Sequence, residues 1–273
     1  TLKISQPQQS LFFGRLFAGI ENSKGEFSSN HSFYDNSKFK EYHDSSFSIR
    51  TYPFFKNTLN AISMYPIMSK SKLDIEIQLK NSKNKIFVHS QKLISPSKNS
   101  IFININEILK KSKLGEISSF SVIARTKNNK VPTRINHQLI YGDIKNNSLN
   151  SSINVSLTNN NDFVPKNKNS FKWGQFLLDN KYDTRLGFCF SKQLNIREKI
   201  KIKFYDNFGL IGEINRMIGD SYSINLTDKD LRKKINNRSR YLWFTAESKR
   251  YDLSAFTFHK NKKSKISSGE HSF

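Results

Sequence analysis

Apolar and polar residues alternate strictly in Leu73-Asp-Ile-Glu-Ile-Gln-Leu-Lys-Asn81, and a similar pattern returns about 125 residues later in Glu198-Lys-Ile-Lys-Ile-Lys-Phe-Tyr-Asp206. A period of two places every second side chain on the same face of a β-strand, whereas a helix repeats every 3.6 residues. Both segments are therefore predicted to be strands with one buried face. Their similarity at a long spacing suggests that the second half of the chain repeats the first.

Further matches lie in the same order on both sides of these strands. Ser46-Phe-Ser-Ile-Arg-Thr-Tyr52 matches Ser170-Phe-Lys-Trp-Gly-Gln-Phe176, and Phe120-Ser-Val-Ile-Ala124 matches Tyr241-Leu-Trp-Phe-Thr245. A chain rich in Asn, Ser, Lys, Ile and Phe can match itself through composition alone. Matches that keep their order along the chain are harder to obtain by chance, so a duplication is the favoured interpretation.

The repeated pattern is typical of an all-β protein. Each copy contains about seven short strands separated by turn-forming residues, as in an antiparallel sandwich and unlike βαβ units. Short helical turns are expected at 105–111 and at 227–234, the second with Thr227 as N-cap and Asp230 at its third position. We therefore predict two tandem antiparallel β-sandwich domains, 1–135 and 136–273, related by internal duplication and holding few short helical turns.

One known family shows a related arrangement. Residues about 57 to 158 hold alternating strands, a short helical turn and then Pro132-Thr-Arg-Ile-Asn-His137 before a closing strand. This order resembles the soluble transducers of bacterial sensory rhodopsin, in which a proline also precedes a histidine by five residues. The resemblance implies a small β-sandwich that binds a small molecule or sugar and associates with copies of itself. It makes Arg134 and His137 candidate ligand-binding residues, together with His259 at the matching place in the second copy.

The residues that usually carry catalysis or metal binding form no known motif here. The histidines lack the short spacings of a local metal site, and no nucleophile, phosphate-binding or dinucleotide-binding motif is present. We predict no catalytic residue, no metal and no cofactor, although catalysis by residues scattered along the sequence stays open. His137 and His259 could each mark a binding pocket or could be strand histidines that are hydrogen-bonded inside a sandwich. Cys189 is the single cysteine, so it is expected to be a buried thiol rather than part of an intramolecular disulfide.

The formal net charge of +23 suggests a polyanionic partner such as nucleic acid. The excess of lysine is spread over both halves, however, and a composition bias would produce the same charge. Two denser clusters form a predicted basic patch, Arg232, Lys233, Lys234, Arg238, Arg240, Lys260, Lys262 and Lys263. These side chains could equally form an ordinary solvated surface. If they bind nucleic acid, the affinity must fall steeply with salt.

Aromatic residues make up 13% of the chain and suggest a second class of ligand. Trp173 and Trp243 are candidate sugar-binding residues, because sugar rings present apolar C–H faces and polar hydroxyl groups. The alternative is that most of the aromatic residues fill the cores. The leading prediction is thus a non-enzymatic binding or assembly protein whose ligand is a glycan or a protein partner. The alternatives are a basic nucleic-acid-binding module and a glycan-modifying enzyme with an unrecognised site.

Hydropathy predicts no membrane span. No stretch reaches the roughly eighteen apolar residues of a transmembrane helix, and the residues after Thr1 lack the pattern of a secretory signal. We expect a soluble protein, with a cytoplasmic location favoured.

Overall fold

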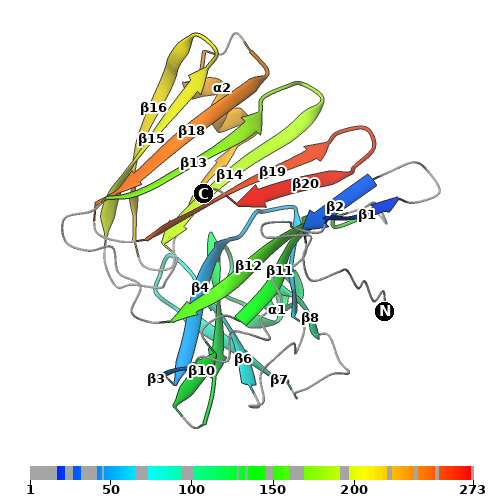
Figure 1. Cartoon of the computed structure of the whole chain (residues 1–273), viewed down its shortest axis with the longest axis vertical. Helices are drawn as coiled ribbons and strands as arrows, with labels where there is room; N and C mark the ends of the chain where they lie inside the picture. Colours follow the sequence, from blue (N-terminus) through cyan, green and yellow to red (C-terminus); the bar gives the residue numbers. More distant parts are fainter. Residues whose placement is uncertain are drawn as a thin grey trace, which may run out of the picture.

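The structure is a computed structural model of the whole chain. It describes residues 17–21, 27–31, 42–44, 46–64, 73–93, 101–127, 129–132, 135–145, 150–159, 169–190, 197–219, 223–236, 239–249 and 252–271. These residues form twenty strands and two short helices (Figure 1). The predicted all-β fold with few short helical turns is therefore confirmed. Neither of the two helices is long and apolar enough to cross a membrane.

The first group of strands forms two four-stranded sheets around one core. Its elements are β4 (Phe47–Pro53), β5 (Leu59–Met64), β6 (Leu73–Lys80), β7 (Ile86–Leu93), β8 (Ile101–Asn104), α1 (Ile105–Ser112), β9 (Ser119–Arg125), β11 (Ile135–Gly142) and β12 (Ser151–Asn159). The strand orders are β7-β6-β9-β4 and β12-β11-β5-β8, and the end of β12 also pairs with β4, which joins the two sheets at one edge.

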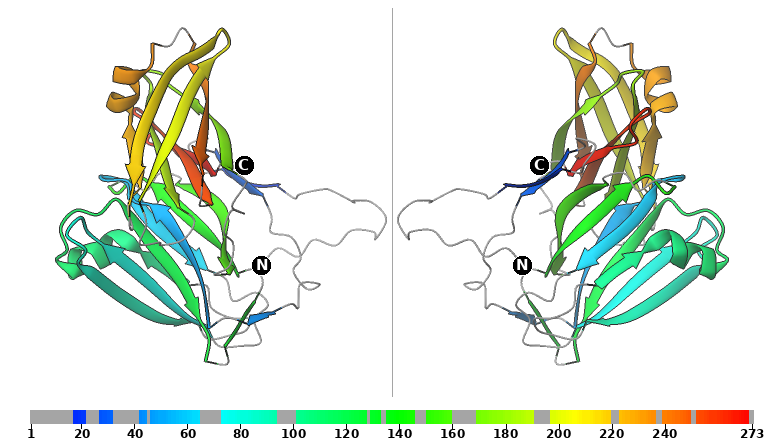
Figure 2. Two further views of the ribbon diagram at one scale, coloured as in Figure 1. Left: turned by 90° about the vertical axis from the view of Figure 1, so that its left-hand side faces the viewer. Right: turned by 90° about the vertical axis from the view of Figure 1, so that its right-hand side faces the viewer.

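The second group follows the same plan. Its elements are β13 (Ser170–Leu177), β14 (Tyr182–Phe190), β15 (Glu198–Asp206), β16 (Gly209–Ile218), β17 (Ile224–Thr227), α2 (Asp228–Lys234), β18 (Tyr241–Ser248), β19 (Leu253–Asn261) and β20 (Ser267–His271). Its strand orders are β13-β18-β15-β16 and β17-β14-β19-β20. When the eight strands of each group are counted along the chain, the two groups have the same strand orders in their sheets. Each helix follows the fifth strand of its group. Figure 2 shows both helices on the same side of the molecule.

The shared topology agrees with the predicted repeat, whose origin in a duplication stays a prediction. The division of the chain differs from the predicted boundary between residues 135 and 136. Strand β11 begins at that boundary and β12 follows it, but β11 pairs with β5 and β12 with β4, so the first group extends to Asn159. The break between the two groups lies between β12 and β13.

Two short pairs of strands lie outside these sheets. β1 (Phe17–Glu21) pairs with β2 (Phe27–His31), and β3 (Tyr42–Asp44) pairs with β10 (Lys130–Pro132).

The alternating segments form strands as predicted. Ile75 and Ile77 in β6 are fully buried, as are Ile200 and Ile202 in β15, while the residues between them reach solvent in part. The predicted helix start at Thr227 is also confirmed, since its side chain accepts a hydrogen bond from the Asp230 backbone N–H and completes a capping box.

The two groups pack directly against each other through β14 and β19. One face of these strands belongs to the second core, while Cys189, Phe256 and Phe258 on the other face join the first core. Close approach is needed at Gly187, where a Cβ atom would lie 2.5 Å from Cβ of Pro53. The sheet β17-β14-β19-β20 is thus buried on both of its faces along these strands, and the two groups share apolar packing.

Candidate functional site

An aromatic surface lies on the outer side of the sheet β13-β18-β15-β16. The pairing of β13 with β18 sets Trp173 opposite Thr245 and Gln175 opposite Trp243. Paired residues share a face, and so do residues two apart on one strand. Both tryptophans of the chain therefore lie on one face of the sheet.

The neighbouring strand extends this surface. Tyr205 on β15 lies opposite Trp243, and Lys203 lies opposite Thr245. Lys201 forms an ion pair with Glu213 of β16 at 3.1 Å from Nζ to Oε2. The face thus combines rings with lysine, carboxylate and amide groups.

These rings are exposed to a degree that core packing does not explain. The exposed fraction of the residue is 50% for Phe171, 46% for Trp173 and 54% for Tyr241, and Trp243 and Tyr205 are half-buried. We name these five residues the aromatic face. The alternate positions of the same strands, such as Phe176 and Phe244, already fill the core. Large exposed apolar surfaces on a folded protein usually mark a binding site.

Arginine borders the aromatic face at one end. The guanidinium carbon of Arg240 lies 4.7 Å from the centre of the Tyr241 ring, and its Nη2 donates to the Tyr241 hydroxyl oxygen at 2.6 Å. This cation–π contact and hydrogen bond hold Tyr241 in place at the surface. A positive charge therefore lies beside the rings, within reach of a ligand that stacks on them.

The matching surface of the first group is buried and cannot bind a ligand. There, Ile49, Thr51 and Ile123 take the corresponding outer positions of β4 and β9 and are buried. In the same strand, the Thr51 carbonyl oxygen accepts a hydrogen bond from Cys189 Sγ of the second group at 3.2 Å. Two sandwiches of equal topology thus present different surfaces, because one sheet is covered and the other is not.

The two predicted ligand-binding histidines lie inside the cores. His137 is fully buried, and its Nε2 lies 2.8 Å from the Tyr52 hydroxyl oxygen. His259 Nε2 accepts a hydrogen bond from the Leu177 backbone N–H at 2.9 Å. Burial lowers the pKa of His137 to about 3 and that of His259 to about 4, so both rings are neutral at pH 7. The structure shows both as hydrogen-bonded core histidines, and their role in ligand binding stays a prediction. Arg134 lies outside the described residues.

The predicted basic patch divides into separate parts. Arg232, Lys233 and Lys234 occupy the last turn of α2, where Arg232 Nε pairs with Asp228 Oδ2 at 2.9 Å. Lys262 and Lys263 lie in the turn between β19 and β20, well apart from α2 in Figure 1.

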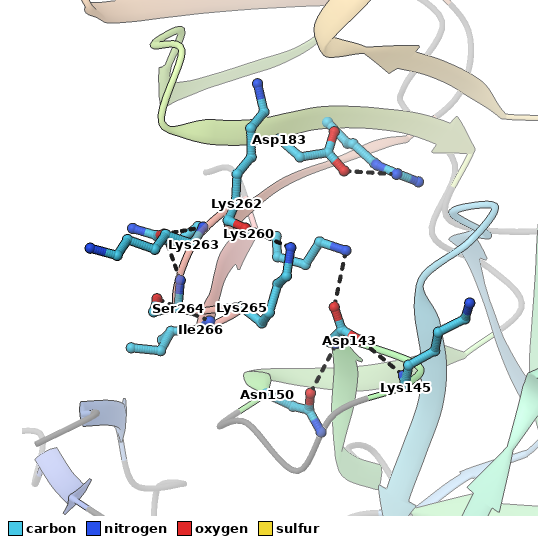
Figure 3. Close-up of polar contacts among 12 residues, drawn as sticks. Asp143, Lys145, Asn150, Asp183, Lys260, Lys262, Lys263, Ser264, Lys265 and Ile266 are labelled. Carbon is cyan, nitrogen blue, oxygen red and sulfur yellow. Dashed lines mark hydrogen bonds and ion pairs between the residues drawn. The ribbon is translucent and has the colours of Figure 1, made fainter. Parts of the chain in front are cut away.

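The remaining described residues of the predicted patch, Lys260 and Arg240, do not form one cluster either. Lys260 turns toward Asp143 at the end of β11, with 3.3 Å between Nζ and Oδ2 (Figure 3). Arg240 belongs to the border of the aromatic face, and Arg238 lies outside the described residues. The fold therefore does not unite these cations into one surface.

Sequence patterns identified Trp173 and Trp243 but missed Phe171, Tyr205 and Tyr241. The alternation in β13 predicts that Phe171 and Trp173 share a face, but it does not say which face is covered. The cross-strand register that adds Tyr205 and Tyr241 is a property of the folded sheet. No family model and no curated protein matches the chain. The function is therefore inferred from the geometry of the aromatic face.

Proposed function

We propose that the protein is a non-enzymatic binding protein that holds a carbohydrate chain against the aromatic face. The observation that carries this proposal is that five aromatic side chains on three adjacent strands share one uncovered surface of a sheet. The C–H face of a sugar ring packs against an aromatic ring and leaves the sugar hydroxyl groups free for hydrogen bonds. Gln175, Thr245 and Lys203 lie on the same surface and supply donors and acceptors for those hydroxyl groups.

The shape of the surface favours a chain of sugars over a single one. Residues two apart on a strand are about 7 Å apart, and neighbouring strands are about 5 Å apart, so the rings extend over several sugar-sized positions. A single sugar would contact only one or two of the rings. An oligosaccharide is therefore expected to bind more tightly as its length increases, until it spans the aromatic face.

Tryptophan fluorescence tests the proposal directly, because both tryptophans of the chain lie on this surface. The protein is titrated with neutral oligosaccharides of glucose, xylose and N-acetylglucosamine and with a uronate oligosaccharide. At least one of them is expected to change the emission in a saturable way. In calorimetry, Trp173→Ala and Trp243→Ala should each weaken the binding by about tenfold, which corresponds to about 1.4 kcal/mol.

A matched control is Phe102→Ala, because Phe102 in β8 is 57% exposed but lies in the other group. This variant should bind as the unchanged protein does. Equal losses in all three variants would contradict binding at the aromatic face, as would the absence of any saturable response across the panel.

Salt dependence separates a glycan from a nucleic acid. Unpaired bases also stack on exposed rings, but their phosphates make the affinity fall steeply between about 50 and 200 mM salt. A neutral oligosaccharide should bind almost equally at both salt concentrations. Tight, salt-sensitive binding of a single-stranded oligonucleotide, with no binding of any sugar, would replace the glycan proposal with the nucleic-acid one.

Self-association follows only from the resemblance to the sensory rhodopsin transducers and is proposed on that basis. Sedimentation of the full chain would measure the proposed association. A monomer at every concentration would remove this part of the proposal and leave the aromatic face unaffected.

A further inference from the structure

A cavity of about 970 Å³ lies between the two groups of strands, away from the aromatic face. Its wall is formed by the turn after β4, by α1, by the end of β11 and by Lys260 at the end of β19. The charged residues that line it are Lys56, Lys110, Lys113, Asp143, Lys145 and Lys260. Five lysines and one aspartate make this hollow strongly positive.

Carboxylates neutralise only part of that charge. Lys56 pairs with Glu116 at 3.1 Å, but both side chains are more than two-thirds exposed, and such pairs are weak. Lys110 pairs with Glu107 on the same helix at 2.9 Å. The described part of the chain shows no acidic partner for Lys113.

The ammonium group of Lys145 also has no acidic partner in the described part of the chain. The backbone N–H of Lys145 donates to Asp143 Oδ1 at 2.9 Å. Two lysine ammonium groups, those of Lys113 and Lys145, are thus available to an anion in the cavity.

One side of the cavity is held in place by contacts between the two groups. Asp143 binds Lys260 of the second group, and its backbone N–H donates to Asn150 Oδ1 at 3.2 Å (Figure 3). Only 9% of the Asp143 side chain and 16% of the Lys260 side chain are exposed. A partly buried ion pair of this kind fixes the wall before a ligand arrives, which lowers the entropy cost of binding.

The rest of the lining is apolar. Phe54 is buried, Leu109 is half-buried and Ile144 is 46% exposed. An inorganic anion alone would leave these side chains unused. An organic body attached to the anionic group would cover them and gain from the removal of apolar surface from water.

We propose that this cavity is a second binding site and that it takes a phosphate monoester of a small organic molecule. A phosphate monoester carries a charge near −2 at pH 7, which matches the two lysines that have no acidic partner. Lysine binds phosphate as a point charge and needs no fixed planar geometry. This site is independent of carbohydrate binding at the aromatic face.

The experiment is a calorimetric titration of the full chain with inorganic phosphate, with a hexose phosphate and with the same hexose without phosphate. The hexose phosphate should bind more tightly than inorganic phosphate, and the plain hexose should not bind in the cavity. The double variant Lys113→Gln Lys145→Gln should bind the hexose phosphate about tenfold more weakly or worse. Thermal unfolding verifies that this variant is folded.

The matched control is Lys229→Gln Lys233→Gln on α2, which removes the same charge from exposed positions outside the cavity. It should bind the hexose phosphate as the unchanged protein does. An equal loss in this control would show that only net charge matters and would overturn the proposal. The proposal would equally fail if the hexose phosphate did not bind, or if it bound no better than inorganic phosphate. None of these results bears on the oligosaccharide titration of the aromatic face.

Discussion

Two buried histidines make the stability of this protein depend on pH. His137 lies against Tyr52, with Arg50 nearby, and His259 accepts a hydrogen bond from the backbone at Leu177. In each case burial is the largest cause of a lowered pKa, because the charged ring would lose its hydration. Each hydrogen bond places an uncharged histidine in a core, where a positive charge would be costly.

The stability should therefore fall as the pH decreases below 6.5, the ordinary pKa of histidine. The unfolded chain then binds protons that the folded protein excludes, so the unfolded state is favoured until the folded pKa values near 3 and 4 are reached. Between pH 6.5 and pH 5 each histidine should cost about 2 kcal/mol of unfolding free energy. Urea unfolding at several pH values measures this loss.

The variant His137→Gln keeps a side chain that can form a hydrogen bond with Tyr52 but does not titrate. It should lose stability at pH 7 and show a smaller further loss toward pH 5 than the unchanged protein. An unchanged pH dependence would mean that His137 is not the titrating group.

At the scale of the strands, β13 carries aromatic residues on both of its faces with opposite roles. Phe176 points into the second core and is 3% exposed, whereas Trp173 points to the surface. Side chains of similar chemistry are thus separated by the pleat of one strand.

Alanine variants at these two positions test the assignment of faces. Phe176→Ala should lower the unfolding free energy by about 3–5 kcal/mol, because it leaves a cavity in the core. Trp173→Ala should change it by less than about 1 kcal/mol, because little buried contact is lost. Urea unfolding by far-UV circular dichroism measures both. A larger loss for Trp173→Ala than for Phe176→Ala would contradict this assignment of the buried and the exposed face of β13.

At the scale of the whole molecule, the two groups of strands share packing and should unfold together. Phe258 of β19 contacts Phe55 and Tyr141 of the first group, with ring centres 5.9 and 5.8 Å apart. Phe256 contacts Tyr52 with ring centres 5.8 Å apart. Residues of the last long strand thus complete a core that begins more than half a chain earlier.

Two probes can test this coupling, since both tryptophans belong to the second group. Thermal unfolding followed by fluorescence and by far-UV circular dichroism should show one transition at the same temperature. Phe258→Ala should shift both signals together to a lower temperature, after a loss of about 3–5 kcal/mol. Two separate transitions in the unchanged protein would show that the groups fold independently.

Local patterns in the sequence determined the elements of this protein. The alternation at Ile75 and Ile77 predicted strands because the pleat repeats every two residues, and Thr227 predicted a helix start because its hydroxyl caps the next turn. The repeated order of these elements indicated the common topology of the two groups. The alternation and the helix cap depend on neighbours that are only a few residues away.

The tertiary structure decided which surfaces remain open. Alternation says that a strand has two faces, but only the tertiary structure shows that the outer positions Ile49 and Ile123 are buried while Trp173 is exposed. The pairing of β11 with β5 extended the first group beyond the predicted boundary, and the packing of the two groups placed Lys260 beside Asp143. These outcomes depend on contacts between residues that are far apart in the chain. Period-two patterns carry no information on such contacts, because burial of a face depends on which other surface packs against it.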